Sequence, residues 1–161
     1  MGARDERRSV GVEHLALPVA VVRTHILRAL AGDHDPAPVR WRDGEAAVVA
    51  HVDEAEVDLG DGWLAVDLPM ACDQLPRQAV RAVFRLGAPG EGDGAAAAFT
   101  LDPSTPAVIA ARWGTVLRDR IWDALLDVFE AAAIAARPEA PGTVVGFACT
   151  DDTLIVEVDL P

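Results

Sequence analysis

The segment from residue 104 to residue 138 carries the longest helical pattern in the chain. Pro106 suits the first helical position, and Ser104 or Thr105 can accept hydrogen bonds from free backbone N–H groups at the helix start. Apolar residues recur at spacings of three and four up to Ala136, which is typical of a helix. They form a first stripe of Ile109, Trp113, Val116, Leu117, Ile121, Leu125 and Val128, and a second stripe of Trp122, Leu126 and Phe129. We therefore predict one continuous helix whose apolar arc is wider than a flat sheet covers.

Alternating apolar and polar residues predict antiparallel strands in the middle of the chain. Residues 46–59 and 63–70 flank a Gly-Asp-Gly turn and indicate a hairpin. Apolar residues fall on even numbers before Asp53 and on odd numbers after Glu54, so one strand cannot keep a single face on the core. We expect a β-bulge there, which would also curve the sheet, although two strands joined by a short break would explain the pattern too.

Further strands are expected at residues 78–86 and 95–101, joined by a glycine-rich loop at residues 87–94. Near the start of the chain we expect a short strand at residues 12–18 and a helix that opens at Pro18 and stops at Gly32. It ends with a hairpin around Asp151 and Asp152.

The predicted fold class is α+β. A curved antiparallel β-meander wraps around one long C-terminal helix, and a shorter helix lies near the N-terminus. We expect residues 1–11 to form a flexible tail and residues 12–161 to form a single domain.

Charge and composition narrow the function. The 161 residues carry a net charge of −12, which opposes binding to nucleic acid and electrostatic attraction to anionic membranes. Every one of the basic residues is an arginine, so a Schiff-base or P-loop lysine is excluded. The charged N-terminus leads into no long apolar run, and we expect a cytoplasmic protein. Cys72 and Cys149 are expected to be buried thiols without a disulfide.

Two groups of residues are candidates for a metal site or a catalytic site. Asp33, His34 and Asp35 could bind a divalent metal, but adjacent loop residues without a further ligand at a defined spacing are typical of a solvated turn. His51 and Asp53 would share a strand face and could act as a general base, yet no nucleophile accompanies them. We therefore predict no catalytic residues, no metal site and no cofactor.

The order of elements resembles the small single-module relatives of the tubular lipid-binding (bactericidal/permeability-increasing-like) superfamily. The likeness is carried by apolar patterns in residues 12–30, 46–69, 107–133 and 151–161. It implies a hydrophobic groove between a curved sheet and the long helix, which takes a lipid or another apolar ligand. The residues it places at that groove are Trp113, Leu117, Ile121 and Leu125 on the helix and Val57, Val66 and Phe84 on the sheet. These relatives are commonly exported or membrane-anchored, whereas this chain shows no export signal.

Two functions follow from this reading. The first is non-catalytic binding of a lipid or other apolar small molecule. The alternative is a protein-interaction module, either a homodimer or an adaptor, that buries Trp122, Leu126 and Phe129 against a partner.

Overall fold

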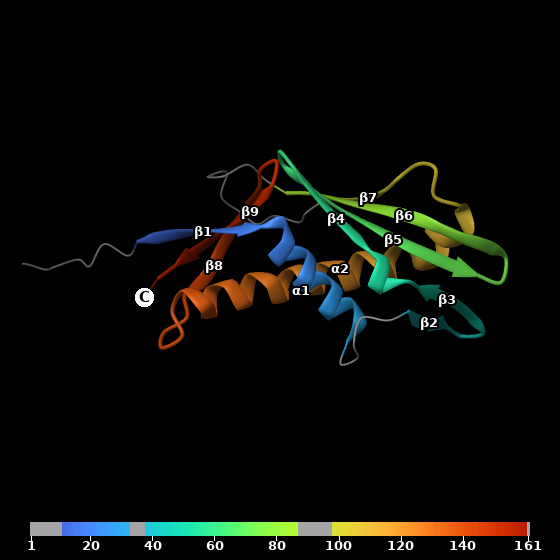
Figure 1. Ribbon diagram of the computed structural model, residues 1–161, viewed down its shortest axis with the longest axis horizontal. Coiled ribbons are helices and arrows are strands. Elements are labelled where there is room, and N and C mark those ends of the chain that lie inside the picture. Colours follow the sequence, from blue (N-terminus) through green and yellow to red (C-terminus); the bar gives the residue numbers. More distant parts are fainter. Residues whose placement is uncertain (1–10, 33–37, 87–97, 161) are drawn as a thin grey trace, which may run out of the picture.

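A computed structural model describes residues 11–32, 38–86 and 98–160, and it has the predicted α+β architecture (Figure 1). Two helices and nine strands follow one another in the described residues. Their bounds are β1 Val12–Pro18, α1 Val19–Ala31, β2 Val39–Asp43, β3 Ala46–Ala50, β4 Glu56–Gly60, β5 Trp63–Cys72, β6 Leu75–Arg85, β7 Ala98–Leu101, α2 Ala107–Ala136, β8 Thr143–Cys149 and β9 Thr153–Asp159. The Asp-His-Asp turn at residues 33–35, the loop at residues 87–94 and most of the predicted tail lie outside the described residues.

The strands divide between two antiparallel sheets. The first and last parts of the chain form a three-stranded sheet in the order β1-β9-β8. The middle of the chain forms a six-stranded sheet in which β2, β3, β5, β6 and β7 follow one another and β4 also pairs with β5. The two sheets meet where the Gly62 N–H donates a 2.9 Å hydrogen bond to the Cys149 carbonyl oxygen.

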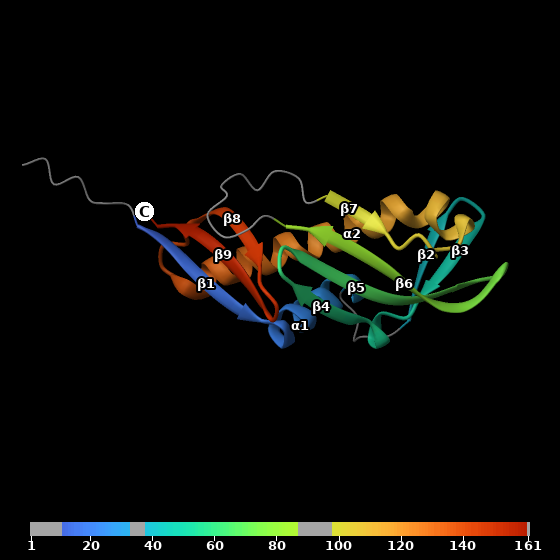
Figure 2. The same ribbon diagram turned by 90° about the horizontal axis from the view of Figure 1, so that it is seen from above.

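The long C-terminal helix is confirmed as one continuous element. α2 has 30 residues and is therefore about 45 Å long at about 1.5 Å per residue. Both views show it extending between the three-stranded sheet and the β2–β3 hairpin (Figures 1 and 2), and α1 packs against it. The predicted cap at its start is wrong, because the Ser104 hydroxyl donates to Asp102 Oδ1 at 2.5 Å and no side chain caps α2.

The predicted β-bulge near Asp53 is also wrong, and the alternative of two strands with a short break is correct. Residues Val52–Glu54 form a single 3₁₀ turn between β3 and β4. Ala50 pairs with Met70 and Glu56 pairs with Asp67, so the chain advances six residues while β5 advances three. A bulge inserts one extra residue and could not absorb that difference. The turn changes the phase of the strand, which lets both Val52 and Ala55 be fully buried.

The interior is one continuous cluster of apolar side chains from both helices and both sheets. The first stripe of α2 faces it, and its members Ile121 and Leu125 are completely buried there. Among the helices that the structure describes, neither combines enough length and apolarity to cross a bilayer.

Candidate functional site

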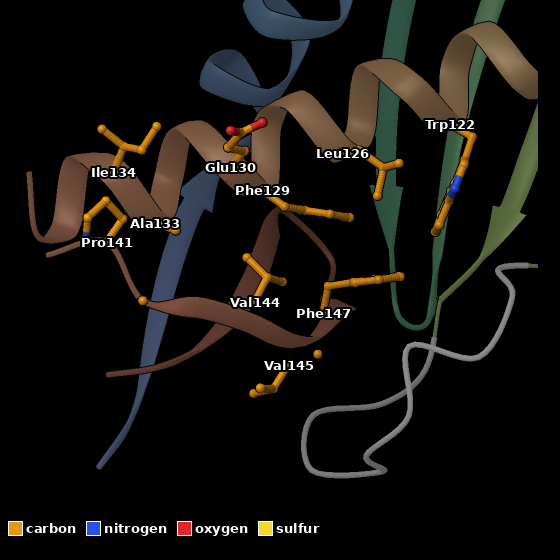
Figure 3. Close-up of a pocket in the computed structure, with 12 residues that line it drawn as sticks. Trp122, Leu126, Phe129, Glu130, Ala133, Ile134, Pro141, Val144, Val145 and Phe147 are labelled. Carbon is orange, nitrogen blue, oxygen red and sulfur yellow. The ribbon is translucent and has the colours of Figure 1, made fainter. Parts of the chain in front are cut away.

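An apolar groove lies between the C-terminal half of α2 and the strand β8 (Figure 3). Its volume is about 580 Å³, within the range of about 300–1,000 Å³ that is typical of small-molecule sites. The residues that line it are Trp122, Leu126, Phe129, Glu130, Ala133 and Ile134 of α2, Pro141 and Gly142 of the connecting segment, and Val144, Val145, Gly146 and Phe147 of β8.

Helical spacing builds the α2 wall of this groove. Trp122, Leu126, Phe129 and Ala133 recur at intervals of four, three and four residues, so they share one face of the helix. Ala133, the last of the four, has the smallest side chain and also lines the groove. The groove therefore follows the second stripe of α2 and extends it toward the helix end.

An irregularity in β8 supplies the opposite wall. Val144 pairs with Val158 and Gly146 pairs with Glu157, so Val145 is an additional residue in the β8–β9 ladder. In a regular strand Val144 and Phe147 would point to opposite faces, because they are three residues apart. The extra residue brings both side chains to the side of β8 that faces α2 (Figure 3).

Aromatic rings from the two walls contact one another and continue into the core. Phe129 and Phe147 stack with ring centroids 4.5 Å apart, and Trp122 meets Phe147 edge-on at 5.7 Å. Trp122 also stacks on buried Phe84 at 6.3 Å, and Phe84 contacts Phe99 at 5.1 Å. Ring pairs at these distances stabilise one another beyond the area that they bury, so these contacts connect α2 to β8.

Exposed apolar side chains are concentrated at the groove. Leu126, Ile134 and Val145 are 44%, 45% and 43% exposed. Two other large apolar residues in the described part of the chain are exposed to a comparable extent, Val12 and Val21, and neither lines the groove. Single exposed apolar residues are ordinary on protein surfaces, but a cluster of them is not, and this makes the groove the candidate site.

The residues that the resemblance assigned to a ligand groove lie elsewhere. All seven belong to the closed core, none is more than 6% exposed, and none lines the groove. They are Trp113, Leu117, Ile121, Leu125, Val57, Val66 and Phe84. By contrast Trp122, Leu126 and Phe129, which were assigned to a partner interface, all line the groove.

The β8 wall was missed from the sequence. A signal was present, because Val144 and Val145 are consecutive apolar residues followed by Gly146 and Phe147. Consecutive apolar residues in a strand with one wet face require a bulge or a second apolar environment. Here the bulge at Val145 accounts for the pattern, and Val145 itself stays 43% exposed.

Other candidate residues do not form a reactive site in the described part of the chain. His51 precedes the 3₁₀ turn that contains Asp53, so the shared strand face predicted for this pair is wrong. Both cysteines are free, and burial raises the pKa of the Cys149 thiol to about 12. Within the described ranges, no three His, Cys, Asp or Glu side chains come together as metal ligands would.

Comparison of the chain with models of protein families, with curated proteins and with solved structures found no match. The resemblance to the tubular lipid-binding superfamily therefore stays a prediction. The groove between α2 and β8 is therefore the feature from which a function can be inferred.

Proposed function

We propose that this protein binds an apolar small molecule, such as the hydrocarbon chain of a lipid, in the groove between α2 and β8. The observation that carries the proposal is the gathering of Leu126, Ile134 and Val145 at one groove with stacked aromatic rings. The role is binding, without a chemical reaction.

The driving force is the removal of apolar surface from water. Each buried CH₂ group contributes about 0.8 kcal/mol, so ten of them contribute about 8 kcal/mol before the ordering costs of binding are subtracted. Because the walls of the groove are partly exposed, a bound chain keeps one side in contact with water. We therefore expect dissociation constants in the micromolar to submillimolar range.

The proposed ligand belongs to the class that the sequence predicted, but its site lies at the second stripe of α2 instead of the first. Leu117, Ile121 and Leu125 are packed on all sides, so a ligand at those residues would have to displace core side chains. The second stripe requires no such displacement.

A matched pair of substitutions tests the proposal. Leu126 and Val21 are both exposed apolar residues on helices, at 44% and 39%, but Leu126 alone of these two lines the groove. Nile red, an uncharged dye that brightens in apolar surroundings, serves as the probe, and uncharged decyl maltoside below its micellar concentration serves as the competitor. We expect Leu126→Gln to raise the dissociation constant of Nile red about fivefold, whereas Val21→Gln leaves it unchanged. Equal effects of the two substitutions, or no binding by the parent protein, would refute the proposal.

A second candidate is a protein-interaction module, and the open side of the groove favours it. Leu126, Ile134 and Val145 are accessible to a surface as large as another protein, whether a second copy of this chain or an adaptor's target. Native mass spectrometry separates the two candidates. Extra mass from a co-purified small molecule on a monomer supports the carrier, and a ligand-free dimer that Leu126→Gln dissociates supports the interaction module.

A further inference from the structure

We infer that the groove selects single-chain amphiphiles with a positively charged head group, such as alkylammonium ions, over fatty acids and other anionic amphiphiles. This inference rests on the proposed function. It specifies the sign of the charge on the ligand's head group, which an apolar lining alone does not determine.

The first observation is the position of Glu130. Of the lining residues, Glu130 alone carries a charge. It lies four residues after Leu126 and four residues before Ile134, so the three side chains form one row along α2. Figure 3 shows the Glu130 carboxylate between these two exposed apolar side chains. An amphiphile that lies along the row would bring its head group next to a carboxylate.

The second observation is the charge of the elements around the groove. From Ile121 to Ala136 the α2 sequence contains acidic residues and no basic one, and β8 carries no charge. Over residues 121–159 the one basic residue is Arg137, which follows the end of α2. The acidic residues of the same stretch are Asp123, Asp127, Glu130, Glu139, Asp151, Asp152, Glu157 and Asp159. In the described part of the chain the Glu130 carboxylate has no basic side chain within ion-pair distance.

The third observation is the direction of α2. The groove extends to Ala133 and Ile134 in the last turn of α2, where the aligned peptide dipoles place about half a negative charge. The last turn of α2 contains no basic side chain, and Arg137, which follows it, is the one cation at this end of the helix. An anion would be bound better at a helix N-terminus, so backbone and side chains here favour the same sign of ligand.

The size of the selection follows from Coulomb's law. Two unit charges about 5 Å apart at a wet protein surface change an affinity by about four- to fifteenfold, depending on the effective dielectric constant. An ammonium head gains this factor relative to a neutral head, and a carboxylate head loses a similar one. We expect an alkylammonium ion to bind at least about tenfold more tightly than the carboxylate of equal chain length.

Three probes with the same chain length test the inference: decyltrimethylammonium, decyl maltoside and decanoate, each below its micellar concentration at pH 7.4. Each displaces Nile red from the parent protein, from Glu130→Gln and from Asp53→Asn. The last variant removes one exposed negative charge from the 3₁₀ turn, away from the groove. Circular dichroism at each probe concentration verifies that the protein remains folded.

The expected order of affinity is decyltrimethylammonium, then decyl maltoside, then decanoate. Glu130→Gln should reduce the ratio between the cation and the anion at least threefold, and Asp53→Asn should leave it within error. Raising the salt concentration to 0.5 M should also reduce the ratio, because the charges are exposed.

The failure of this inference can be distinguished from the failure of the proposed function. Binding of all three probes with equal affinity, or tightest binding of decanoate, would overturn the charge selection and leave apolar binding intact. Displacement by none of the probes would overturn both. A dimer that Leu126→Gln dissociates, together with no probe binding, would assign the groove to a second copy of the chain and also overturn both.

Discussion

Leu125 and Leu126 are adjacent in α2 and chemically identical, but the structure places them in opposite environments. Leu125 is completely buried in the core, whereas Leu126 is largely exposed and lines the groove. Substituting each by alanine therefore separates the stability of the core from the function of the groove. Alanine preserves helix propensity at both positions, so the local conformation of α2 should not differ between the variants.

The two substitutions should change stability by very different amounts. Leu125→Ala removes three carbon atoms from a closely packed interior and is expected to lower the free energy of unfolding by about 2–5 kcal/mol. For a chain of this length that corresponds to a decrease in melting temperature of roughly 4–20 °C. Leu126→Ala removes atoms that already contact water and should cost less than about 1 kcal/mol.

Urea unfolding followed by circular dichroism measures both values, and Nile red binding at low temperature measures the groove. Leu126→Ala should weaken binding while Leu125→Ala leaves the binding of the folded fraction unchanged. The reasoning would be refuted by similar losses of stability, which would mean that α2 is rotated relative to the core. It would also be refuted if Leu125→Ala alone weakened binding, because the ligand would then occupy the interior that the family resemblance suggested.

Three further predictions concern packing elsewhere in the molecule. Because burial raises the pKa of the Cys149 thiol to about 12, this thiol stays protonated at pH 8 and should resist N-ethylmaleimide in the folded protein, whereas half-buried Cys72 reacts. Peptide mass spectrometry measures this, and labelling of both at one rate would contradict it. A Cβ at Gly60 would collide with the Trp63 ring, so Gly60→Ala should destabilise the protein by about 1–3 kcal/mol. Gly114 lies in the interior of α2, where the nearest neighbour of an added Cβ would be Leu101 Cδ1 at 3.4 Å. Gly114→Ala should therefore stabilise the protein by up to about 1 kcal/mol. Urea unfolding measures both glycine variants, and a higher midpoint for Gly60→Ala than for Gly114→Ala would contradict both predictions.

The elements with a long or regular pattern were predictable from sequence. Thirty residues of helical periodicity located α2 to within one residue at its start, and the Gly-Asp-Gly turn predicted the β4–β5 hairpin. The strand β2 was missed, although Asp43 and Gly44 form a hairpin signal before β3. Gly44 adopts a positive φ of 62°, which is the conformation that this signal reflects.

The phase change near Asp53 shows the limit of local patterns. A bulge and a short 3₁₀ turn both shift the apolar residues from even to odd positions. The number of extra residues distinguishes them, and that number is defined by where β3 and β4 pair on β5. Pairing between strands is a non-local property, so the local sequence could not determine it.

The position of the candidate site depended on the same kind of information. The two stripes of α2 have the same periodicity and similar residues, so nothing local indicates which one the rest of the protein covers. Six of the seven residues of the first stripe are buried in the core, and Val116 is partly buried against it. The second stripe is covered only in part by β8, and its member Leu126 stays 44% exposed.

This division explains why the helix is apolar over such a wide arc. A helix that only supported the core would gain nothing from Leu126 and Ile134, because a polar residue at either position would keep the same buried face and improve solubility. Exposed apolar side chains next to stacked aromatic rings therefore point to a requirement beyond folding. The Glu130 carboxylate lies between those two side chains, and its position favours one kind of occupant over another. An apolar protein surface packed on the groove would remove water from Glu130 without replacing its hydrogen bonds, whereas the head group of a cationic amphiphile would neutralise its charge.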